Sequence, residues 1–96
     1  MNQKKIITVK EYCIEIHKLL IEVEEFEWAK CFENFILELE ESENNSVYRK
    51  LISIYGGMDS FSDLVLYKNG ILCRKENDVL SELKKGLFNE IGNSWT

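Results

Sequence analysis

Proline is absent from this 96-residue sequence, histidine occurs once and cysteine occurs three times. No apolar run approaches the roughly 18 residues that a membrane-spanning helix needs, and no long apolar stretch follows the N-terminal lysines as in a secretory signal. Cys13, Cys31 and Cys73 form no Cys-x-x-Cys pair, so neither a zinc knuckle nor a thioredoxin motif is expected, and their odd number and wide spacing predict no disulfide. We therefore expect a cytoplasmic protein with reduced thiols and no membrane association.

Positive charge is also scarce, because 12 Lys and Arg stand against 17 Asp and Glu and give a net charge of −5. Phosphate binding needs concentrated positive charge, so no nucleic-acid partner is expected. Cys13 and His17 could face one metal ion from a helix, but two ligands do not make a zinc site. No nucleophile elbow or phosphate loop is present. We expect neither an enzyme nor a bound metal or cofactor.

The composition that remains is globular, with 45% hydrophobic and 30% charged residues. At this length it predicts a single domain over residues 1–96. Thr8 and Glu11 have the spacing of a capping box, and an apolar stripe with helical period follows as far as Val23. A second amphipathic stretch predicts a helix over Phe26–Glu41. No glycine or proline separates the two helices, and only a cluster of mutually repelling glutamates places the break.

In the second half of the chain, the apolar residues change from helical spacing to the alternating spacing of strands. A third helix is predicted to end at Gly56, in the left-handed conformation that favours glycine. Asn69 and Gly70 lie between the β-type runs 64–67 and 71–74, which predicts a type I′ hairpin with Tyr67 opposite Leu72. This hairpin is expected to lie against the helices, since two strands alone are marginally stable.

The closing helix is predicted to begin at Asn77-Asp78 and to stop at Gly92. Gly86 inside it either permits close helix packing or weakens the helix, and both readings remain open. The fold class is therefore mainly α: a small four-helix domain with one β-hairpin between the third and fourth helices, in which the first two helices form an antiparallel pair.

One segment concentrates negative charge. Between Glu22 and Glu43 there are nine glutamates and one lysine, a net charge of −8, whereas the rest of the chain sums to +3. A charge run of this kind is commonly a solvated helix face. The functional alternative is a docking surface for a basic protein partner, because concentrated negative potential accelerates encounter. The candidate partner-binding residues are Glu24, Glu25, Glu27, Glu38 and Glu41.

Two functions follow from these observations. Toxins that degrade nucleic acids are basic where they bind phosphate, and their cytosolic inhibitors are often small and acidic. By this analogy the protein is expected to be an immunity protein that neutralises a bacterial toxin by direct binding. The alternative is a structural or regulatory homo-oligomer.

The most distinctive stretch runs from Tyr55 to Leu66. Its candidate structural motif consists of Gly56, Gly57, Met58, Ser60, Phe61 and Asp63. Backbone needs explain it as a helix stop, a tight corner capped by Ser60 and one helical turn, with Met58 and Phe61 anchored in the core.

This stretch resembles the signature of a small bacterial family of uncharacterised domains. Two further segments support the resemblance, Glu27-Trp28-Ala29 in an early helix and a Leu-rich closing helix over Asn77–Ile91. Asp59 and Ser62 stand where Gly and Asn are more usual. The family implies no activity and no catalytic residues. The chain is similar to immunity proteins in its size and acidity alone.

Overall fold

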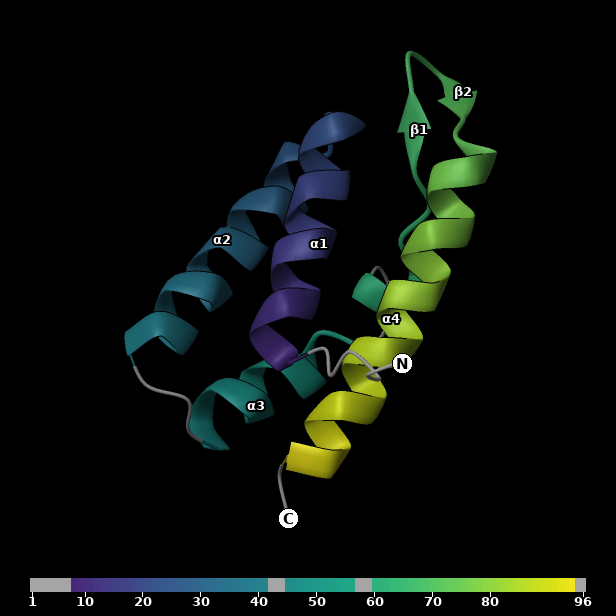
Figure 1. The fold of residues 1–96 in the computed structure, drawn as a ribbon. Helices are drawn as coiled ribbons and strands as arrows, with labels where there is room; N and C mark the ends of the chain where they lie inside the picture. The colour runs from purple at the N-terminus through teal and green to yellow at the C-terminus, as the bar shows by residue number, and fades with distance from the viewer. Residues whose placement is uncertain (1–7, 42–44, 57–59, 95–96) are drawn as a thin grey trace, which may run out of the picture.

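The computed structural model describes residues 8–41, 45–56 and 60–94 and confirms the predicted fold class (Figure 1). The elements in chain order are α1 (Val9–Glu22), α2 (Phe26–Glu41), α3 (Asn45–Ser53), the 3₁₀ turn η1 (Phe61–Asp63), β1 (Tyr67–Lys68), β2 (Ile71–Leu72) and α4 (Arg74–Ser94). Helix α1 lies between α2 and α4 and contacts both. The predicted antiparallel pairing of the first two helices is confirmed.

Helix α1 begins at the predicted capping box. The amide of Glu11 donates to the Thr8 hydroxyl at 3.2 Å, and the amide of Thr8 donates to the Glu11 carboxylate at 3.2 Å. Two amides that a helix start leaves unpaired are thereby satisfied. The apolar stripe that follows is buried and consists of Val9, Cys13, Ile16 and Leu20.

The corner between α1 and α2 is built without glycine. The amide of Glu25 donates to the Leu20 carbonyl at 2.8 Å, and that of Glu24 donates to the Ile21 carbonyl at 3.1 Å. These two bonds are those of a Schellman motif, which needs a left-handed residue at its second-last position. Glu24 occupies that position with a φ of 63°, which is unfavourable for a residue with a side chain. The predicted start of α2 at Phe26 is confirmed.

The end of α3 differs from the prediction. The amides of Ile54 and Tyr55 donate to the carbonyls of Leu51 and Ile52, so the helix tightens into a turn after Ser53. Gly56 lies beyond this turn, and its φ is outside the left-handed region. The prediction of a left-handed Gly56 is therefore wrong, because bonds over three residues already end the helix.

The turn η1 confirms the predicted helical turn after Ser60, but Ser60 does not cap it with its side chain. Its hydroxyl instead lies 2.8 Å from that of Ser62, and the Ser62 hydroxyl donates to the Tyr55 carbonyl at 2.7 Å. The Ser60 hydroxyl also donates to this carbonyl at 3.5 Å, so the two serines satisfy a carbonyl of the turn that follows α3. Gly57, Met58 and Asp59 lie outside the described residues.

The hairpin has the predicted register and turn. Tyr67 pairs with Leu72, and Asn69 and Gly70 have φ values of 54° and 78°, as a type I′ turn requires. Each strand is only two residues long, shorter than the predicted runs. The expectation that the hairpin lies against the helices is wrong for the strands, which project past α4 (Figure 1) and leave Ile71 71% exposed.

The base of the hairpin is anchored by Leu66, which is fully buried, and by Asn77. The Asn77 side chain accepts from the Leu66 amide at 2.8 Å and donates to the carbonyls of Leu66 and Cys73 at 3.0 and 2.8 Å. Helix α4 begins at Arg74, and the Asn77 amide already donates to the Cys73 carbonyl at 2.8 Å, so the predicted start at Asn77 is wrong. The helix also continues through Gly92, so the predicted stop at Gly92 is wrong.

Gly86 allows α1 and α4 to approach each other. A Cβ atom added to Gly86 would lie 2.5 Å from Cε1 and Oη of Tyr12 on α1. This contact decides between the two readings of Gly86 in favour of close packing.

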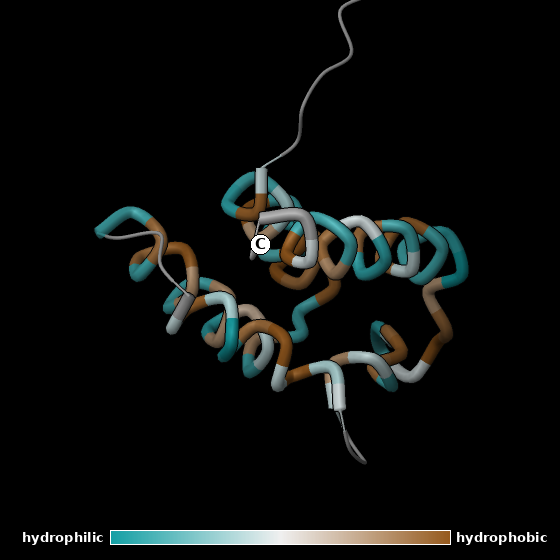
Figure 2. Tube along the Cα trace, turned by 90° about the horizontal axis from the view of Figure 1, so that it is seen from below, coloured by the Kyte–Doolittle hydropathy of each residue, from teal (hydrophilic) through white to brown (hydrophobic). Residues whose placement is uncertain are grey.

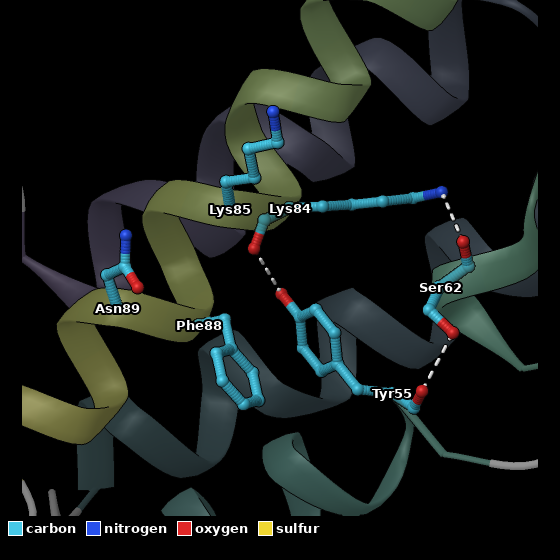
Figure 3. Close-up of a pocket in the computed structure, with 6 residues that line it drawn as sticks. All are labelled: Tyr55, Ser62, Lys84, Lys85, Phe88 and Asn89. Atoms are coloured by element: carbon cyan, nitrogen blue, oxygen red, sulfur yellow. Dashed lines mark hydrogen bonds between the residues drawn. The ribbon is translucent and has the colours of Figure 1, made fainter.

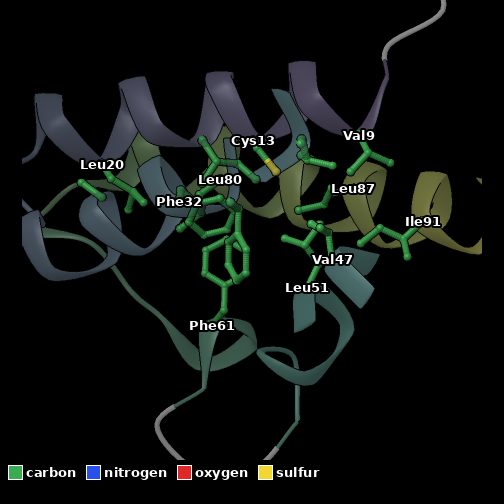
Figure 4. Packing of buried hydrophobic residues seen from close by; sticks show 14 of the residues in the cluster. Val9, Cys13, Leu20, Phe32, Val47, Leu51, Phe61, Leu80, Leu87 and Ile91 are labelled. Carbon is green, nitrogen blue, oxygen red and sulfur yellow. The ribbon is translucent and has the colours of Figure 1, made fainter. Parts of the chain in front are cut away.

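A single core joins the four helices and η1. Phe61 is fully buried and lies beside Phe32 (Figure 4), with the two ring centroids 4.9 Å apart. The ring centroid of Trp28 lies 5.4 Å from that of Phe61. Hydrophobic and hydrophilic positions alternate along the helical traces (Figure 2), as amphipathic helices around one core require.

Candidate functional site

The outer face of α2 is exposed along its whole length. Its exposed residues are Phe26, Glu27, Lys30, Glu33, Asn34, Leu37, Glu40 and Glu41. Helical spacing places them away from Ala29, Phe32, Phe35 and Leu39, which face the core. The face therefore combines four carboxylates and one ammonium group with two apolar side chains.

The five predicted acidic residues differ in exposure and in ion pairing. Glu27 and Glu41 lie on the outer face and make no ion pair within the described part of the chain. They are 14 positions apart, which corresponds to about 21 Å along the helix. Glu25 is half-buried at the corner, where its carbonyl accepts from the Ala29 amide at 3.1 Å.

The other two predicted residues already have partners. Glu38 forms an ion pair of 2.8 Å with Lys50 of α3, and Glu24 lies 3.7 Å from Lys68 of the hairpin. Both pairs are solvent-exposed, so each contributes little to stability. They nevertheless reduce the negative charge that Glu24 and Glu38 offer to a partner.

Sequence reasoning missed four members of this face, namely Glu33, Glu40, Phe26 and Leu37. Glu40 pairs with Lys10 of α1 at 3.3 Å, whereas Glu33 makes no ion pair within the described residues. Phe26 and Leu37 are 58% and 54% exposed. Their spacing of 11 residues, three helical turns, is the signal in the sequence that places both on one side.

A second surface feature lies beside η1. A hollow of about 460 Å³, called here the aromatic hollow, is lined by Tyr55, Ser62, Lys84, Lys85, Phe88 and Asn89 (Figure 3). The ring centroids of Tyr55 and Phe88 are 5.1 Å apart, and the Tyr55 hydroxyl donates to the Lys84 carbonyl at 2.9 Å. The rings are thus held in place between the end of α3 and α4.

Lys84 binds the segment that follows η1. Its ammonium group donates to the carbonyls of Leu64 and Ser62 at 2.9 and 3.3 Å, and it lies 5.3 Å from the centre of the Phe61 ring. Burial lowers the pKa of Lys84, and the negative charge of Asp63 acts in the opposite direction. These contacts give Lys84 a structural role in joining η1 to α4.

The described residues include only part of the candidate structural motif. Phe61 is the core anchor that the sequence predicts, Ser60 is buried beside it, and Asp63 is exposed. Within the described residues, no group of three or more His, Cys, Asp or Glu comes together in a way that could hold a metal ion. None of the helices in this part of the chain combines the length and hydrophobicity of a membrane span.

Comparison with known proteins relates part of the chain to a protein family. The family described as a domain of unknown function, DUF6966, matches residues 21–74, from the last turn of α1 to the start of α4. The matched range includes the outer face of α2 and the hairpin, but not the closing helix on which the resemblance also relied. No curated protein and no solved structure matches the chain.

Proposed function

Because the chain belongs to DUF6966, a family of domains of unknown function, we propose a function from its own surface: it binds a basic protein on the outer face of α2. In its most specific form the proposal is an immunity protein that neutralises a bacterial toxin in the cytoplasm by direct binding. One observation carries it. Glu27, Glu33 and Glu41 are exposed and free of ion pairs within the described residues, and they surround the exposed side chains of Phe26 and Leu37.

Each component of this face has a physical role in binding. Free carboxylates on one face concentrate negative potential, which raises the rate of encounter with a basic surface and orients it. Apolar side chains exclude water when a partner covers them and slow dissociation. A face that carried charge alone would attract many cations weakly, whereas Phe26 and Leu37 supply two points that require a complementary shape.

The proposal also explains why the partner is a basic protein. A toxin domain that acts on nucleic acid needs a basic surface for phosphate contacts. An acidic protein that covers this surface competes directly with the nucleic acid. An immunity gene lies directly after its toxin gene, so the upstream neighbour of this gene should encode a protein with a basic domain.

The test compares two variants of equal net charge. Glu27→Lys/Glu41→Lys reverses the outer face, and Glu15→Lys/Glu82→Lys reverses two exposed carboxylates on α1 and α4. Each protein is immobilised and exposed to lysate of the native host, and the captured proteins are compared by quantitative mass spectrometry.

The proposal expects a basic protein that wild type and the control variant retain and that the outer-face variant loses. Equal capture by all three proteins would overturn it, because binding would then not depend on this face. Circular dichroism of each variant confirms that the fold is retained, as expected for exposed charges.

The hairpin favours a second candidate, the structural or regulatory homo-oligomer. Tyr67 and Leu72 form a cross-strand pair on one face and are both exposed, and Ile71 is exposed at the tip. Tyr67→Ser/Leu72→Ser should abolish self-association through this surface, as measured by size-exclusion chromatography with light scattering. Self-association that this variant retains would exclude the hairpin as its cause.

A further inference from the structure

The aromatic hollow presents ring surface and positive charge together. Phe88 is 46% exposed although its ring packs on Tyr55, so one part of the ring is open to solvent. Lys85 is exposed and makes no ion pair within the described residues, and the aliphatic stem of Lys84 forms another part of the lining. None of the described residues that line the hollow carries a carboxylate. An occupant that matches this lining is an aromatic side chain accompanied by carboxylates.

The chain itself carries such a group at the corner between α1 and α2. Phe26 is 58% exposed, and its neighbours in the sequence are Glu24, Glu25 and Glu27. Glu27 is exposed and without an ion pair in the described part of the chain. The corner is held by the Schellman bonds of Glu24 and Glu25, so Phe26 is presented from a defined backbone. Its chemistry is the complement of the aromatic hollow.

The corner and the hollow cannot meet within one molecule. Helix α1 separates α2 from α4, and the packed core fixes both helices on it (Figure 1). We propose that Phe26 of one copy inserts into the aromatic hollow of a second copy, with Glu27 placed against Lys85. The contact is heterologous, since two different surfaces meet, and the bound pair still offers one free corner and one free hollow. Association therefore continues into short chains as the concentration rises.

The size of the contact sets its strength. One aromatic insertion and one exposed charge pair make a small interface, which is typical of weak association. The charge pair also makes the association sensitive to salt. A basic partner bound to the outer face of α2 would cover Phe26 and Glu27, so partner binding and self-association exclude each other.

Sedimentation velocity over a range from about 10 μM to 1 mM at low ionic strength tests this contact. The weight-average sedimentation coefficient of wild type should rise with concentration and fall back when salt is added. Phe26→Ala, Glu27→Lys and Lys85→Glu should each abolish the rise. Lys75→Glu, which reverses an exposed charge on α4 outside the contact, should show the same rise as wild type.

A mixing experiment tests whether Glu27 of one copy lies against Lys85 of another. Glu27→Lys and Lys85→Glu should each remain monomeric alone, and an equimolar mixture should associate because the altered corner of one matches the altered hollow of the other. A wild type that is monomeric at 1 mM would overturn the proposal, as would self-association that Phe26→Ala and Lys85→Glu both leave unchanged. Neither result affects the proposed binding of a foreign basic partner, which is measured separately.

Discussion

Replacement of Gly86 by alanine tests the packing of α1 against α4. In an open helix this change stabilises by about 1 kcal/mol, because alanine loses less conformational entropy than glycine. Here the new methyl group would lie 2.5 Å from the Tyr12 ring, and such overpacking costs about 1–3 kcal/mol. Gly86→Ala should therefore change the free energy of unfolding by between about 0 and −2 kcal/mol.

Gly86→Ala should instead increase the free energy of unfolding once the Tyr12 side chain is replaced by a shorter one. In a Tyr12→Leu background the atoms Cε1, Cζ and Oη are absent, so Gly86→Ala should stabilise by about 0.5–1 kcal/mol. Gly92→Ala is the matched control on the same helix, since its added Cβ has no neighbour within 4 Å. Urea denaturation followed by circular dichroism measures all variants. Equal stabilisation by Gly86→Ala in both backgrounds would refute the close-packing argument.

Three further perturbations test other parts of the fold. Asn77→Ala should destabilise by about 2–4 kcal/mol in urea denaturation, because it removes three hydrogen bonds and leaves the Leu66 amide unpaired; a loss below 1 kcal/mol would contradict the anchoring role. Glu24→Gly should stabilise by about 0.5–1 kcal/mol by relieving the left-handed strain, and a lower urea midpoint would count against the Schellman corner. Burial raises the pKa of the Cys13 thiol from 9.0 to about 12, so the unfolded chain loses this proton at lower pH than the folded protein does. The free energy of unfolding should therefore fall as the pH rises from 9 to 12. Cys13→Ala should make this fall shallower, and an unchanged dependence of stability on pH would refute the assignment.

Local patterns were sufficient to predict most of the fold. The capping box at Thr8 and the Asn69-Gly70 turn depend on short-range geometry, and both are where the sequence placed them. Gly56 was assigned a left-handed conformation because glycine commonly ends helices. Hydrogen bonds over three residues end α3 first, and nothing in the local sequence distinguishes the two endings.

Asn77 and Glu24 show what local patterns cannot reveal. Asparagine is a common helix cap, but the side chain of Asn77 binds the backbone of Leu66, which only the folded hairpin brings near. Glu24 adopts a conformation that favours glycine because the packing of α1 and α2 requires a tight corner at that position. Tertiary packing overrode local preference at both residues.

The candidate site also combines features that local sequence predicts with features that depend on tertiary structure. Charge density in the sequence identified α2 as the acidic element, and helical period placed Glu27 and Glu41 on its outer face. The ion pairs of Glu24 and Glu38 involve Lys68 and Lys50, which come from other elements, so the sequence could not show that these two charges are engaged. The exposure of Phe26 and Leu37 also required knowledge of which side of α2 faces the core.

The rate of association with the captured basic protein tests the central claim most directly. Stopped-flow or surface-based kinetics would compare wild type, Glu27→Lys/Glu41→Lys and Glu15→Lys/Glu82→Lys at two salt concentrations. If the outer face of α2 is the docking surface, only Glu27→Lys/Glu41→Lys should associate more slowly than wild type, and its association rate should depend less on salt. Equal association rates and salt dependence for the two variants would contradict the claim and identify the acidic stretch as a solvated helix face.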